Sequence, residues 1–161
     1  MYSPQEIQTF SNIFNGAENR YGKLTHWDEK TGEKTLYEEK EPIPIQDHLN
    51  IPKEYLGRSP VNEKTLMCEW LGVDIDIKYD AKGFCSRLWS VIGTQYFPFM
   101  TLNKKWRVIE FLDEPLDVKL AHARAKALQE RIKTELGIET DDKSTTPTIP
   151  NEPGACGRWL F

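Results

Sequence analysis

The chain has 161 residues, of which 39% are hydrophobic and 29% are charged, as is typical of a single soluble domain long enough to bury a core. No apolar run approaches the roughly 20 residues that span a bilayer, so we expect no membrane span and a cytoplasmic location. A net charge of −4 argues against binding of nucleic acid over a broad, sequence-independent surface.

The first part of the chain predicts a helix, a hairpin and a long loop. A capping-box pattern begins at Ser3, and the apolar residues that follow it have helical spacing as far as Gly16. Two strand-like segments, 20–27 and 34–37, flank a turn signal and predict a β-hairpin. Residues 39–62 are rich in proline and charge, so we expect a loop with at most one helical turn.

The second part predicts a buried strand, a helix, two strands joined by a turn, and a long helix, over residues 66–77, 80–93, 96–101, 106–112 and 115–137. Pro98 favours a late start or an edge position for the second of these strands, because proline cannot donate to a strand ladder. Strands mixed with helices predict an α/β or α+β domain in which helices flank a mixed sheet. Three scattered cysteines indicate neither a disulfide framework nor a structural zinc site.

Asp74 and Asp76 stand two residues apart in an otherwise apolar strand. Because strand side chains alternate, both carboxylates face one side, with their α-carbons about 6.5 Å apart, while Val73, Ile75 and Ile77 face the other. Two anions this close stay ionised only if a cation lies between them, and Mg²⁺ is the simplest candidate. The alternative is an exposed edge whose charges discourage aggregation.

Three further groups could reach the same face of the sheet. The turn at 101–105 offers a hydroxyl, an amide and two ammonium groups to a triphosphate, through Thr101, Asn103, Lys104 and Lys105. An acid after the long helix, Asp141 or Asp142, could be a third metal ligand, and Arg158 could contact phosphate or template. Each also has a plain explanation, as a polar turn, an acidic loop and an exposed arginine.

Several short motifs occur in order over nearly the whole chain. They are Phe-x-x-x-Phe-x-Gly-x-x-x-x-Tyr-Gly from Phe10 to Gly22, His48-Leu49, Val-Asp-Ile-Asp at 73–76, Thr-Leu-Asn-Lys-Lys-Trp-Arg-Val at 101–108, and Phe-Leu-Asp-Glu-Pro at 111–115. In this order they resemble the archaeo-eukaryotic primase superfamily, and the likeness is strongest to primase-polymerase domains of phage, plasmid and mobile-element replication proteins.

The resemblance implies a primase-like catalytic core with an RNA-recognition-like half. Asp74 and Asp76 match the Asp-x-Asp pair that holds divalent metal in that family, and Asp142 is favoured over Asp141 as its later acid. Thr101-Leu102-Asn103 stands in place of a Ser-x-His nucleotide-binding motif, with Lys104 and Lys105 as substitute phosphate ligands. The family usually continues past the position of Phe161, so residues 1–161 are expected to be the N-terminal catalytic domain of a longer protein.

The function that the resemblance implies is that of a DNA primase-polymerase, a template-directed nucleotidyltransferase in DNA replication. Its cofactor would be Mg²⁺ or Mn²⁺. Its partners would be single-stranded DNA template, nucleoside triphosphates and a helicase domain. Two other functions stay open: an inactive nucleic-acid-binding or replication-initiation module, and a metal-dependent nuclease or phosphodiesterase.

Overall fold

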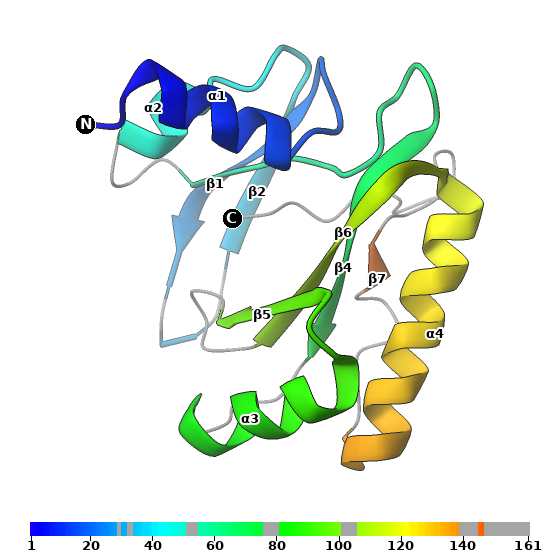
Figure 1. Ribbon diagram of the computed structural model, residues 1–161. Helices are drawn as coiled ribbons and strands as arrows, with labels where there is room; N and C mark the ends of the chain where they lie inside the picture. Colours follow the sequence, from blue (N-terminus) through cyan, green and yellow to red (C-terminus); the bar gives the residue numbers. More distant parts are fainter. Residues whose placement is uncertain are drawn as a thin grey trace.

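The computed structural model describes residues 1–28, 30–31, 34–50, 55–75, 81–100, 106–138 and 145–146. These residues form four helices and two antiparallel sheets (Figure 1). The N-terminal elements are α1 (Pro4–Ile13), β1 (Tyr21–Trp27), β2 (Lys34–Glu39), α2 (Ile45–Asn50) and β3 (Tyr55–Gly57). They are followed by β4 (Met67–Ile75), α3 (Ala81–Ile92), β5 (Tyr96–Met100), β6 (Trp106–Asp117), α4 (Val118–Leu136) and β7 (Thr145–Thr146).

The second sheet has a split β-α-β arrangement. Its elements follow the order β4-α3-β5-β6-α4-β7, and its strands lie in the order β5-β6-β4-β7. The prediction of strands mixed with helices is confirmed. The prediction of a mixed sheet is wrong for the described strands, because β6 lies between the two strands that α3 connects and every pairing is antiparallel. β5 lies at an edge, as Pro98 predicted.

One face of this sheet packs against α3 and α4, and the main core lies between them (Figure 1). The core residues of β4 are Leu71, Val73 and Ile75, each completely buried. The helices contribute stripes at the predicted spacing, of which Phe84, Leu88, Ala125, Leu128 and Ile132 belong to the same cluster. The alternation predicted for β4 is therefore confirmed on its apolar side.

The ends of three helices test the predicted boundaries. α3 and α4 stop before Gly93 and Gly137, which have φ of 90° and 64°, as the sequence predicted. The capping box of Ser3 is present, but α1 ends at Ile13, before the predicted stop at Gly16. Of the two residues predicted to open α4, Asp117 is confirmed as its N-cap, whereas Pro115 still lies in β6.

Gly16 serves a close contact rather than a helix end. A Cβ atom on Gly16 would lie 2.0 Å from the carbonyl oxygen of Ser59, and the neighbouring Ala17 N–H donates to that oxygen at 3.0 Å. The segment after α1 therefore runs against the segment after β3, an approach that only glycine permits. Helical spacing in the sequence carries no sign of this contact.

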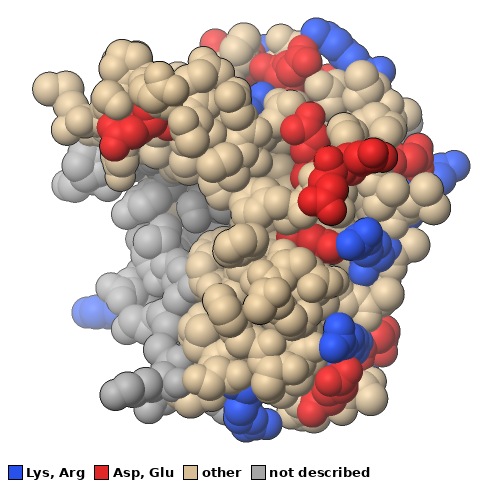
Figure 2. All heavy atoms as spheres, viewed as in Figure 1, with Lys and Arg blue, Asp and Glu red and all other residues tan. Residues whose placement is uncertain are grey.

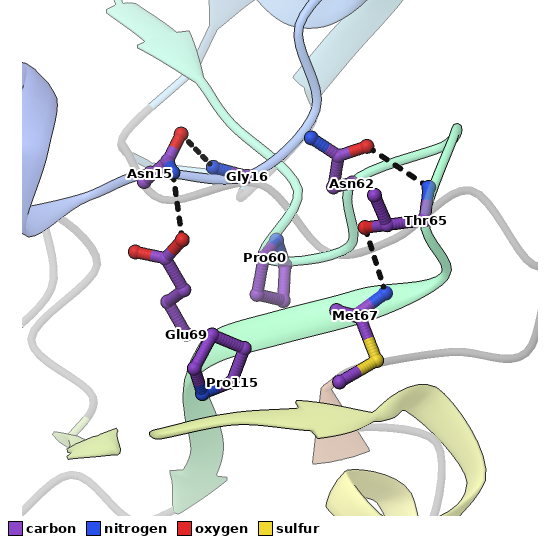
Figure 3. Close-up of a pocket in the computed structure, with 8 residues that line it drawn as sticks. All are labelled: Asn15, Gly16, Pro60, Asn62, Thr65, Met67, Glu69 and Pro115. Carbon is purple, nitrogen blue, oxygen red and sulfur yellow. Dashed lines mark hydrogen bonds between the residues drawn. The ribbon is translucent and has the colours of Figure 1, made fainter. Parts of the chain in front are cut away.

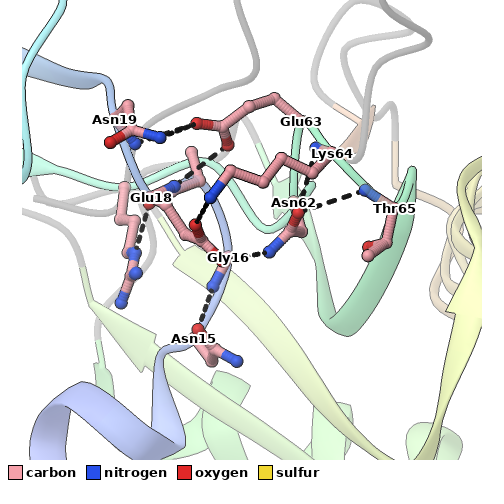
Figure 4. Close-up of polar contacts among 10 residues, drawn as sticks. Asn15, Gly16, Glu18, Asn19, Asn62, Glu63, Lys64 and Thr65 are labelled. Carbon is pink, nitrogen blue, oxygen red and sulfur yellow. Dashed lines mark hydrogen bonds and ion pairs between the residues drawn. The ribbon is translucent and has the colours of Figure 1, made fainter.

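Aromatic rings and polar side chains join the N-terminal part to the second sheet. The ring of Phe14 packs against Trp70 of β4 and Phe111 of β6, with centroids 6.1 and 5.5 Å apart. The Trp70 indole N–H donates to the carbonyl oxygen of Asn15 at 2.6 Å. Nearby, the Glu63 carboxylate accepts from the backbone N–H groups of Glu18 and Asn19 (Figure 4).

Candidate functional site

Asp74 lies on the face of the second sheet opposite to α3 and α4. Its strand neighbours Val73 and Ile75 belong to the core, whereas the Asp74 side chain is 21% exposed. This is the side on which the alternation of the strand placed it. Asp76, its predicted companion, lies outside the described residues.

Arg107 is the cation beside Asp74. The two residues are direct partners in the antiparallel ladder of β4 and β6. The guanidinium binds the carboxylate in a bidentate manner, with Nη2 donating to Oδ2 at 2.9 Å and Nε donating to Oδ1. The Arg107 side chain is 13% exposed, so the pair is partly withdrawn from water.

Charge repulsion between Asp74 and Asp76 predicts a cation next to Asp74, but it does not identify Arg107. A signal was present, because Arg107 is the one positively charged residue of β6. What the sequence could not supply was the register that sets Arg107 opposite Asp74. An arginine partner neutralises one carboxylate with protein groups, and the magnesium expected at this face stays a prediction.

The other predicted site residues, Asp76, Thr101, Asn103, Lys104, Lys105, Asp142 and Arg158, lie outside the described residues, as does Asp141. Among the predicted site residues, Asp74 is therefore the one whose position the structure describes. The structure does describe the residues that flank 101–105: Met100 and Trp106 pair with each other, and Trp106 also pairs with Ile75.

A second arginine–carboxylate pair lies on the opposite, helix-covered side of β6. The Glu110 side chain is 3% exposed and binds the guanidinium of Arg124 on α4, with Nε donating to Oε2 at 3.0 Å. Hydrogen bonding to Glu110 raises the pKa of Arg124. This pair links α4 to the sheet, so we assign it a structural role.

A small pocket lies between the N-terminal segment and the start of β4 (Figure 3). Its volume is about 220 Å³, and it is lined by Asn15, Gly16, Pro60, Asn62, Thr65, Met67, Glu69 and Pro115. The Asn15 amide donates to the Glu69 carboxylate at 2.8 Å, and Asn62 and Thr65 accept from backbone N–H groups. Because these polar groups already bind one another, we interpret the pocket as part of the packing between these two segments.

The surface charge is uneven. Figure 2 shows acidic side chains gathered where β6 leads into α4, the stretch that contains Asp113, Glu114 and Asp117, all exposed. This part of the surface would repel the phosphates of a polynucleotide.

The described residues contain no cluster of three or more histidine, cysteine, aspartate or glutamate side chains placed to hold a metal ion. They also contain no helix that is long and apolar enough to cross a membrane.

No protein-family model and no curated protein matches the chain. The resemblance to primase-polymerases thus depends on the motifs in the sequence.

Proposed function

We propose that this chain is a primase-polymerase domain, a template-directed nucleotidyltransferase that makes or extends primers. The observation that carries the proposal is the position of Asp74 on the face of a split β-α-β sheet that α3 and α4 leave uncovered, with Arg107 bound to it. Split β-α-β topology is also what an RNA-recognition-like half would have. Because one fold serves many functions, the proposal depends on the acid and its surroundings rather than on topology.

The cofactor in this proposal is Mg²⁺ or Mn²⁺. Asp74 offers the carboxylate oxygens that both ions prefer, and its pairing with Arg107 indicates a spot where positive charge is accommodated. Asp74, Asp76 and Asp142 would hold the metal, which when bound supplies charge neutralisation to the phosphoryl group in transfer.

The reaction joins two nucleotides. The 3′ hydroxyl of a primer, or of a first nucleotide, attacks the α-phosphate of a nucleoside triphosphate, a new phosphodiester bond forms, and pyrophosphate leaves. Thr101, Asn103, Lys104 and Lys105 would bind the triphosphate, and Arg158 would contact phosphate or template. Single-stranded DNA would be the template, and a helicase domain on the same or another chain would expose it.

The test is primer synthesis and extension on single-stranded DNA, with labelled nucleoside triphosphates and Mg²⁺ or Mn²⁺. Asp74→Asn/Asp76→Asn removes two charges while keeping side-chain shape, and Asp113→Asn/Glu114→Gln removes two exposed charges from β6 as a matched control. We expect extended product and pyrophosphate from the wild type and the control, and neither from the first variant. Shortened strands without pyrophosphate would identify a nuclease instead.

A second candidate, a nucleic-acid-binding module without turnover, is favoured by Phe97. This residue of β5 is 51% exposed, and its ring packs at 5.5 Å against Phe111, on the same sheet face as Arg107. Exposed aromatic rings on a sheet are platforms on which bases stack. Under this candidate, Phe97→Ala weakens oligonucleotide binding about tenfold. Trp89→Ala, which removes a comparably exposed ring from α3, leaves binding unchanged.

A further inference from the structure

The bond between Arg107 and Asp74 is not needed to hold two elements together. These residues are already opposite each other in the continuous ladder of β4 and β6. The pair of Glu110 and Arg124 differs, because it joins a strand to a helix and its carboxylate is almost fully buried. The two pairs have the same bidentate geometry, so their surroundings set their roles apart.

The environment of Arg107 favours exchange of one anion for another. At 13% exposure, a guanidinium that loses its bidentate carboxylate is poorly compensated by water, so a simple opening of the pair is costly. Exchange of the carboxylate for a phosphate keeps the charge paired throughout. Phosphate accepts the same fork of two parallel N–H bonds that Asp74 accepts now.

We infer that Arg107 is a phosphate-binding residue, which Asp74 holds in position until the phosphates of a nucleoside triphosphate replace it. Asp74 released in this way becomes available to a divalent cation, so binding of the two ligands is coupled through one ion pair. The inference rests on the proposed function in naming a triphosphate as the ligand. A role for Arg107 and an order of events are thereby added to what the sequence motifs imply.

The coupling has a definite sign. Asp74 competes with phosphate for the same two N–H groups, so loss of the Asp74 charge should strengthen triphosphate binding in the absence of metal. Loss of the Arg107 fork should weaken it. An arginine that serves only the stability of the sheet would produce neither effect.

The experiment measures binding of a fluorescently labelled nucleoside triphosphate to the chain in EDTA, with circular dichroism to establish that each variant is folded. We expect Arg107→Ala to weaken binding by about tenfold or more, as for loss of a charge-assisted bidentate contact. Arg107→Lys keeps the charge but loses the bidentate geometry, so its affinity for the triphosphate should lie between those of wild type and Arg107→Ala. Asp74→Asn should tighten binding several-fold.

The matched control is Arg131→Ala on α4. Arg131 also pairs with a carboxylate, that of Glu135, but the pair is an exposed one within a single helix. Its loss removes the same charge from the protein, so binding equal to wild type would exclude a general electrostatic effect. Folded Arg107→Ala protein that binds the triphosphate as wild type does would overturn the inference.

Two further arms separate the possible ligands and the two proposals. An oligonucleotide with a 5′ hydroxyl should not displace the labelled triphosphate. If it does, and its own affinity depends on Arg107, the arginine contacts the strand and the triphosphate assignment is wrong. Triphosphate binding that depends on Arg107 in a protein without synthetic activity would sustain the inference while refuting the polymerase function.

Discussion

Replacement of Gly16 by alanine tests how the N-terminal segment is joined to the second half of the chain. The added Cβ would lie 2.0 Å from the Ser59 carbonyl oxygen, so one of the two backbones must move by about 1 Å or more. That movement breaks the bond from Ala17 N–H, worth about 1 kcal/mol, since Ser59 is buried. Overpacking adds about 1–3 kcal/mol, which gives a total loss of about 2–4 kcal/mol.

Urea unfolding followed by circular dichroism measures this loss. With a slope of about 2 kcal/mol per molar urea, the midpoint should fall by about 1–2 M. Gly83→Ala is the matched control, because no atom lies within 4 Å of the added methyl group and alanine favours the helix α3. It should raise stability by about 0.5–1 kcal/mol. Equal midpoints for Gly16→Ala and wild type would refute the close approach to Ser59.

Three other predictions concern ionisable groups. Burial opposes ionisation of the Glu63 carboxyl group, but hydrogen bonds from backbone N–H groups outweigh burial and lower the pKa of Glu63. The stability that the ionised carboxylate contributes above its ordinary pKa of 4.5 is therefore lost on acidification. Glu63→Gln should therefore lose less stability than wild type between about pH 5 and pH 3, as urea midpoints will measure. Burial raises the pKa of the Cys68 thiol to about 12, so mass spectrometry should find Cys68 unalkylated in folded protein at neutral pH and alkylated in urea. The stability that the protonated thiol contributes is present below its ordinary pKa of 9.0 and is lost as the pH rises toward 12. Arg124→Ala leaves Glu110 buried without its partner and should cost about 2–3 kcal/mol in thermal unfolding, whereas Arg131→Ala should cost less than about 0.5 kcal/mol; equal losses would contradict the structural role of the Glu110 pair.

Local patterns in the sequence were sufficient for most of the elements. The capping box at Ser3, the glycine stops at Gly93 and Gly137, and the alternation in β4 all depend on neighbours within a few residues. Such signals act through backbone geometry and side-chain spacing, which do not require knowledge of the rest of the fold. They also placed Asp74 on the face opposite to the core.

The sequence-based predictions are wrong where the conformation of a residue depends on a partner that is distant in the sequence. Gly16 was read as a helix stop, because its contact with Ser59 spans more than forty positions of sequence. β6 was expected to end at Leu112, but it continues to Asp117 past an irregularity in its pairing with β4. Mixed pairing was expected where the insertion of β6 between β4 and β5 makes the described sheet antiparallel.

The candidate site shows the same division between local and long-range determinants. The sequence determined that a carboxylate at position 74 would face away from the core and would need a positive partner, because strand alternation and charge repulsion are local. Only the tertiary structure decided that Arg107 is that partner, because strand register depends on packing between segments more than thirty residues apart.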